Sequence, residues 1–157
     1  MMTFDSEYST SWRNRLSKRL LLIALVLAGA GLADATYLTV EHYRGAIPTC
    51  GLTGGCEAVL TSRWSAVGPV PIALLGSVFY AVVFLLTMAA WESTSGREVV
   101  WLQRLVTVAF AVTLVLLALQ AFVIGSWCAY CLFSAVMVSL LLAVVSFVRY
   151  RMRWLSG

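Results

Sequence analysis

The chain has 157 residues, of which 61% are hydrophobic and only 11% are charged. It contains several apolar runs of about 20 residues, the length that a helix needs to cross a bilayer. The formal net charge of +4 is not arranged as a stripe of basic and aromatic residues of the kind that follows a nucleic-acid backbone. The composition therefore predicts an integral membrane protein and gives no support to nucleic-acid binding.

Four apolar runs follow one another along the chain. At about 1.5 Å of rise per residue, each run can span a hydrocarbon core of roughly 30 Å as a helix. Helices are expected because backbone polar groups in lipid must be satisfied within the segment itself. We predict an all-α membrane protein, a four-transmembrane-helix bundle without internal repeats, with spans at residues 20–40, 70–91, 99–124 and 128–148.

Lysine and arginine residues set the expected orientation, because short loops rich in them stay in the cytoplasm. Most of them lie before the first run, between the second and third, or after the fourth, and only Arg44 and Arg63 remain for the other side. We expect both termini in the cytoplasm and all four cysteines on the exoplasmic side. The predicted parts are a cytoplasmic tail (1–19), a membrane domain (20–149) with a sizeable exoplasmic loop between helices 1 and 2 (41–69), and a cytoplasmic tail (150–157).

A cleaved signal peptide is an alternative interpretation of the N-terminal region, since a basic stretch, an apolar run and Ala33-Asp34-Ala35 imitate that pattern. The apolar character resumes at once with Tyr37 and Leu38. A four-span count also places both basic ends on one side. The intact mass of the purified protein separates the two interpretations.

The first cysteine pair is Cys50 and Cys56, whose five-residue spacer contains three glycines. Glycine allows backbone angles closed to other residues, so the two sulfurs can approach to the roughly 2 Å of a disulfide. This pair is either redox-active or a plain disulfide that stabilises an external loop, as oxidising compartments permit.

The second pair, Cys128 and Cys131, stands where the fourth predicted span begins. Residues three apart share one face of a helix, and the dipole and unpaired amides at its N-terminus favour a thiolate. A lowered thiol pKa is the usual basis of CxxC reactivity. Half of a zinc or copper site is the alternative, but no second CxxC completes it and the only histidine is His42. Together the pairs suggest an electron relay, and we expect no metal.

Further motifs stand between and beside the cysteine pairs. The ordered set is Cys50, Cys56, Thr61-Ser62-Arg63-Trp64, Gly68, Pro71, Gly76, Phe79-Tyr80 and Trp127-Cys128-Ala129-Tyr130-Cys131. In this order the motifs resemble the vitamin K epoxide reductase family of four-helix membrane oxidoreductases, over most of the chain between residues 20 and 149. In bacterial DsbB-type quinone reductases, by contrast, the CxxC lies in the first external loop.

The resemblance implies that Cys128 and Cys131 are the active-site pair, with Cys131 facing a bound quinone, while Cys50 and Cys56 carry electrons from an exoplasmic thioredoxin-fold, DsbA-like protein. The acceptor would be a membrane quinone of the ubiquinone, menaquinone or phylloquinone type, and the reaction would support disulfide bond formation. The expected location is the bacterial inner membrane, with the active site on the periplasmic side.

Three departures separate the chain from the vertebrate members, which have a longer spacer between the loop cysteines, a Thr-Tyr-Ala motif after the CxxC and an asparagine over the quinone. Here Leu-Phe-Ser-Ala (132–135) follows the CxxC. The only asparagine, Asn14, is expected on the cytoplasmic side of the membrane, opposite to the expected quinone site. The chain is therefore expected to belong to a prokaryotic branch that uses a respiratory quinone, without a fused thioredoxin domain.

A quinone pocket is expected near the exoplasmic boundary. Aromatic residues also gather at membrane interfaces and in bundle cores without any ligand, so lipid contact is the alternative for each. The candidate quinone-binding residues are Ser62, which would donate a hydrogen bond to a ring oxygen, and Phe79, Tyr80, Phe122, Trp127, Tyr130 and Phe133.

Asp34 is the only acidic residue well inside a predicted span. Carboxyl groups inside a membrane are costly and often functional, so it either helps a proton to reach the quinone or hydrogen-bonds a neighbouring helix. Gln120 is read as an interhelical hydrogen-bonding group, and Glu41 and His42 as solvated loop residues. Two other functions stay open for the whole chain, a tetraspan scaffold with structural disulfides and a small metal-handling membrane protein.

Overall fold

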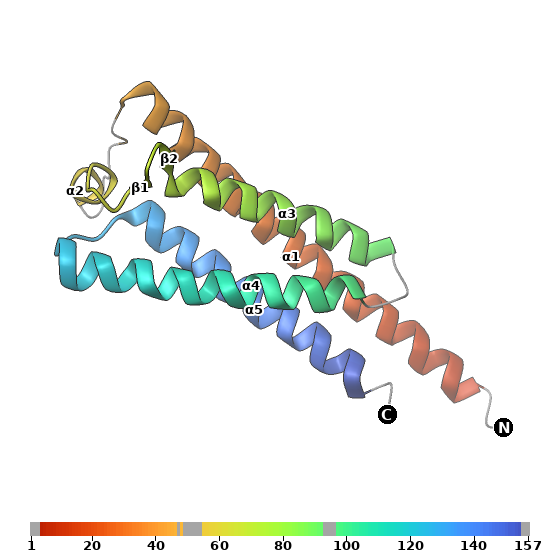
Figure 1. Cartoon of the computed structure of the whole chain (residues 1–157). Helices are drawn as coiled ribbons and strands as arrows, with labels where there is room; N and C mark the ends of the chain where they lie inside the picture. The colour runs from red at the N-terminus through yellow and green to blue at the C-terminus, as the bar shows by residue number, and fades with distance from the viewer. Residues whose placement is uncertain (1–3, 47, 49–54, 93–96, 155–157) are drawn as a thin grey trace.

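The computed structural model describes residues 4–46, 48, 55–92 and 97–154, with the side chains of residues 4–17 left out. Four long helices form a bundle, and both chain termini lie at the same end of it (Figure 1). Helix α1 contacts α3 and α5, and α4 also contacts both, so the four helices close into a ring. The predicted all-α bundle is confirmed, with α1 at Phe4–Arg44, α3 at Ile72–Glu92, α4 at Arg97–Ala118 and α5 at Ala129–Trp154.

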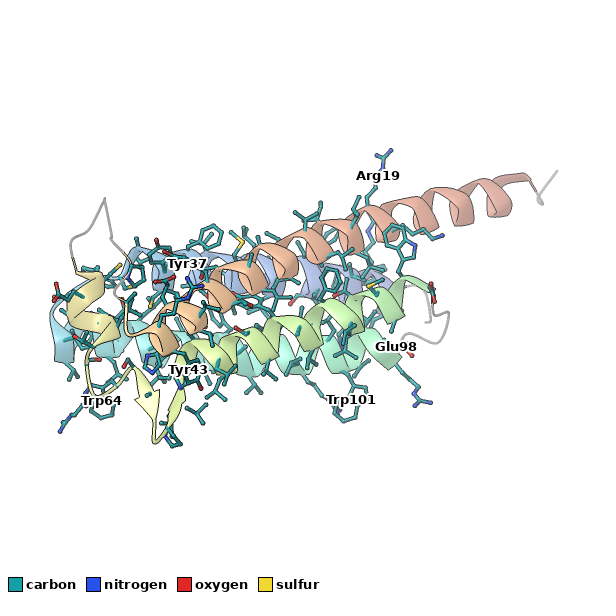
Figure 2. All side chains as sticks on the ribbon, turned by 90° about the horizontal axis from the view of Figure 1, so that it is seen from above. Arg19, Tyr37, Tyr43, Trp64, Glu98 and Trp101 are labelled. Atoms are coloured by element: carbon teal, nitrogen blue, oxygen red, sulfur yellow. The ribbon has the colours of Figure 1, made fainter. Side chains whose placement is uncertain are left out.

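Each long helix carries a segment that is apolar and long enough to cross a membrane. Many large apolar side chains point outward, as lipid contact allows. Figure 2 shows Tyr43 and Trp64 toward one end of the bundle and Arg19 and Trp101 toward the other. Aromatic and basic side chains in two such zones are typical of the two membrane interfaces. The membrane segments are Lys18–Arg44, Ile72–Glu92, Arg97–Ile124 and Ala129–Trp154.

Helix α1 begins at Phe4, well before the apolar run that predicted it, and extends past the rest of the bundle (Figure 1). Adding a residue to an existing helix costs far less than nucleating a new one, so a polar segment can prolong a membrane helix without partners. Residues 4–19, which precede the apolar run, are therefore helical.

Small residues on α1 allow the helices to approach closely, as is common in membrane bundles. Ala24, Ala28 and Ala35 are buried in the main core. Gly31 lies against the ring of Tyr80, and a methyl group at this position would overlap that ring. The core of the bundle is filled by Ala24, Ala28, Ala35, Tyr80, Val83, Leu102, Val106, Val138, Leu141 and Val145.

The end of the bundle away from the termini has an irregular backbone. Between α1 and α3 lie the short helix α2 (Cys56–Leu60) and the antiparallel strands β1 (Ala66–Val67) and β2 (Val70–Pro71). Gly68 turns the hairpin with a φ of 63°, in the left-handed region that favours glycine. Helix α4 continues as a π-helix, η1 (Leu119–Ile124). The apolar pattern of the sequence indicated neither the hairpin nor the π-helix.

Candidate active site

Cys128 is the residue that immediately precedes α5, and its side chain is fully buried. Its carbonyl oxygen accepts a hydrogen bond from the Leu132 amide at 3.0 Å. Its own amide donates to the side-chain oxygen of Gln120 at 3.1 Å. Gln120 lies in η1, whose C-terminal end is capped by Gly125 with a φ of 68°. The π-helix and this left-handed glycine therefore fix the start of α5 and the position of Cys128.

The Cys128 sulfur is surrounded by hydrogen-bond donors. The Cys131 thiol, and to a smaller extent the backbone amides of Cys131 and Tyr130, lower the pKa of Cys128 to about 7, against opposing contributions from burial and from Asp34. These amides belong to the first turn of α5, whose unpaired N–H groups and dipole stabilise an anion. Cys128 therefore carries substantial thiolate at neutral pH, the form that reacts in disulfide exchange.

Cys56, the first residue of α2, lies directly beside this thiol. Its sulfur is 3.5 Å from the sulfur of Cys128, and both side chains are buried in one small cluster with Val59. Cys56 is disulfide-bonded, whereas Cys128 and Cys131 are free thiols. Cys50, the remaining cysteine of the chain, lies outside the described residues. A disulfide sulfur in contact with a free thiol of lowered pKa is the arrangement that thiol-disulfide exchange needs.

Gly55 allows this approach of α2 to α5. A methyl group at Gly55 would lie 2.7 Å from the carbonyl oxygen and 3.0 Å from the amide nitrogen of Trp127, both backbone atoms that cannot easily move. Only glycine lets the chain before Cys56 pass this close to the segment that leads into Cys128.

Cys131 faces a different environment from Cys128. It lines a cavity of about 730 Å³ between the helices, to which Cys128 does not contribute. The lining is mainly apolar, and Leu75 of α3 and Val108 of α4 line it while remaining more than half exposed on the outer surface. The cavity therefore reaches the lipid-facing side of the bundle between α3 and α4. Its volume lies within the range of small-molecule sites.

Four of the seven predicted quinone-binding residues line this cavity: Ser62, Phe79, Tyr80 and Tyr130. Tyr80 is buried, and its hydroxyl donates a hydrogen bond to the Ser134 carbonyl at 3.0 Å. Ser62 donates its hydroxyl proton to the Val59 carbonyl at 2.7 Å. In this rotamer the Ser62 hydroxyl proton is bound to the Val59 carbonyl and does not point to a ring oxygen of the quinone, as the sequence had led us to expect.

The other three predicted residues do not line the cavity. Phe122 is 89% exposed, and Trp127 and Phe133 are also exposed on the outside of the bundle. They lie near the boundary where aromatic residues gather because the interface favours them. Spacing along the sequence did not show which face of the helix each would occupy, and we leave them out of the site.

Three further polar residues, Gln120, Asp34 and His42, line the cavity. The Gln120 side chain accepts a hydrogen bond from the amide of Cys128 at the start of α5. His42 is exposed, as expected, but it and Glu41 belong to α1 rather than to a loop. The signal for the first two was available, since polar side chains inside a span usually face the interior of the bundle.

No group of three histidine, cysteine or acidic side chains lies close enough to hold a metal ion within the described part of the chain. The fold and the site instead define a four-helix membrane protein with paired cysteines at one end. A model of the vitamin K epoxide reductase family matches residues 22–146. The chain belongs to the vitamin K epoxide reductase family, which indicates an oxidoreductase with a redox role in disulfide formation.

Proposed function

We propose that this protein is a quinone-dependent thiol-disulfide oxidoreductase. Electrons pass from an exoplasmic thioredoxin-fold protein to Cys50 and Cys56, then to Cys128 and Cys131, and finally to a membrane quinone. The observation that carries this proposal is the 3.5 Å distance between the sulfur of the disulfide-bonded Cys56 and the free thiol of Cys128.

The transfer between the two pairs is an ordinary exchange of disulfides. Once the partner protein has reduced the outer pair, the Cys56 thiolate attacks the Cys128 sulfur of an oxidised inner pair and releases Cys131 as a thiolate. Cys50 then attacks Cys56 and releases Cys128, so that two electrons have moved inward. A thiol of low pKa leaves quickly, and the pKa of Cys128 is lowered to about 7.

The oxidation states in the structure agree with the product of this exchange, since Cys56 is in a disulfide while Cys128 and Cys131 are thiols. Cys131 then faces the cavity in which we place the quinone ring. A bound quinone supplies the two-electron acceptor. As the bond between Cys128 and Cys131 re-forms, the pair gives up two electrons and two protons.

The chain's own residues fit a quinone in this cavity. Phe79, Tyr80 and Tyr130 supply flat apolar surfaces to the cavity that Cys131 also lines, and the opening toward lipid between α3 and α4 suits a long apolar tail. Few polar groups line the cavity, as is usual for ligands of this kind. The type of quinone follows from none of these contacts.

We further propose that the cysteine end of the bundle faces the periplasm of a bacterial inner membrane. Both termini lie at the opposite end (Figure 1), next to most of the lysine and arginine residues. Basic flanks are retained in the cytoplasm.

Two variants test the division of labour between the pairs. Cys131→Ala should abolish quinone reduction with every electron donor, because no thiol then faces the cavity and Cys128 has no partner with which to form a disulfide. Cys50→Ala should block turnover with a DsbA-like donor while sparing reduction by a small dithiol that reaches the inner pair directly. Equal loss of both activities in Cys50→Ala would contradict the proposal and favour a disulfide that only braces the loop.

A further inference from the structure

Asp34 carries a carboxyl group within the membrane segment of α1, and the proposed electron relay assigns no role to it. Its Oδ2 atom is buried and has no hydrogen-bond partner among the described residues. An unsatisfied polar atom in an apolar interior is costly. If Asp34 served only to join two helices, Oδ2 would be expected to meet a donor on one of them.

The position of Asp34 points instead to the cavity. It lines the same cavity as Cys131, and it contributes the only carboxyl group among the described residues of that lining. It is also close enough for its charge to act on Cys128, Cys131 and Tyr80. The carboxyl group thus lines the space proposed for the acceptor together with Cys131, one of the two thiols that lose protons.

Three other polar side chains of the cavity lining are already engaged. The Tyr80 hydroxyl donates to the Ser134 carbonyl, and the Gln120 side-chain oxygen accepts from the Cys128 amide. The Ser62 hydroxyl donates to the Val59 carbonyl. Asp34 retains a free oxygen that can take up a proton and release it again.

We propose that Asp34 is the proton relay of the quinone-reducing step, an inference that rests on the proposed function. Its carboxylate accepts the proton that the Cys131 thiol loses as the bond to Cys128 forms, and passes it to a ring oxygen of the quinone. The dithiol loses two electrons and two protons, the quinone gains both, and the carboxyl group ends as it began.

The test compares Asp34→Asn with wild type, using a short-chain ubiquinone as acceptor and a small dithiol as donor. Asparagine has the same shape but cannot carry a proton. General acid-base groups contribute roughly a hundredfold or more, so kcat for quinone reduction should fall by about a hundredfold, while KM changes by less than about threefold. The solvent deuterium isotope effect on kcat should rise, and Asp34→Glu should recover part of the rate.

Two further measurements separate a proton relay from a structural role. The affinity for the same ubiquinone, followed by quenching of tryptophan fluorescence, should be unchanged in Asp34→Asn. Disulfide exchange between the cysteine pairs, followed by mass spectrometry without quinone, should also be unchanged. The matched control is Glu41→Gln on the same helix, since Glu41 does not line the cavity and pairs with Arg44 at 3.7 Å; it should behave as wild type.

Wild-type kcat in Asp34→Asn, with exchange intact, would overturn the relay. Parallel loss of quinone affinity and exchange would overturn it as well, because the carboxyl group would then only hold the site together. If the wild-type protein itself fails to reduce the quinone although its cysteines exchange, the proposed function fails, and that result is distinct from the first two.

Discussion

The two ends of the bundle are built differently. The end that carries the termini has a small core of Leu21, Ala90, Val99 and Val148, and the ammonium group of Lys18 lies over the ring of Trp91. At the other end, cysteines replace part of the apolar core, and the backbone includes a short helix, a hairpin, a π-helix and glycines with positive φ. Regular packing is sufficient to hold helices together, whereas placing two sulfurs from distant segments in contact requires irregular backbone. The comparison assigns stability mainly to one end and chemistry to the other.

Gly55→Ala should show the difference between the two ends most strongly, because it should impair the chemistry of the cysteine end. The added methyl group meets the Trp127 backbone at 2.7 Å, so α2 must move away and the Cys56 sulfur must leave Cys128. A misplacement of about 1 Å can reduce a rate by roughly a hundredfold. We expect the exchange between the cysteine pairs to slow by about tenfold to a hundredfold, measured by rapid quenching and mass spectrometry, while quinone reduction driven by a small dithiol stays near wild type.

Gly29→Ala is the matched control for this variant. A methyl group at Gly29 would meet only the ring of Phe84, at the ordinary distance of 3.9 Å. It should change neither rate. Unaltered exchange in Gly55→Ala would contradict the view that close contact between α2 and the start of α5 sets the exchange rate.

The pH dependence of Cys128 gives a second, smaller effect at the cysteine end. The pKa of Cys128 is lowered to about 7, chiefly by the Cys131 thiol, so the thiolate is present above this pH and is lost as the pH falls through it. At pH 6 about one tenth of the Cys128 side chains should be thiolate. A cysteine with the ordinary pKa of about 8.5 would have almost no thiolate at this pH. Thiolate absorbance, taken as the difference between wild type and Cys128→Ser, should therefore titrate near pH 7.

Cys131→Ala sharpens this titration. It removes the side-chain hydrogen-bond donor that lowers the pKa of Cys128 most, so the midpoint of Cys128 should move upward. A midpoint near 8.5 already in the wild type would mean that the first turn of α5 does not activate this thiol.

Val99→Ala probes the opposite end and should have the smallest effect on activity. Val99 is buried in the apolar cluster near the termini, so its truncation should cost about 1 kcal/mol of stability through lost packing. The thermal midpoint in detergent should fall while kcat changes by less than about twofold. A large loss of activity without a loss of stability would contradict the view that the end near the termini contributes to stability and not to the chemistry.

The sequence predicts the regular end of the molecule better than the irregular one. The apolar runs indicate four spans because lipid demands a helix of a set length, and the motif order from Cys50 to Cys131 indicates the family. The position of Gln120 depends on a π-helix, which leaves no mark on hydropathy. The contact between Gly55 and the Trp127 backbone joins segments more than 70 residues apart, and interfacial aromatics such as Phe122 look the same in sequence whether they face lipid or a ligand.

The contact between Cys56 and Cys128 is the central claim, and a variant carrying both Cys50→Ser and Cys131→Ser tests it most directly. Only Cys56 and Cys128 then remain as cysteines. With their sulfurs 3.5 Å apart, mild oxidation of the folded protein in membranes should join them completely, as peptide mapping under non-reducing conditions would show. Two thiols that stay separate, each taking up a label after unfolding, would contradict the account.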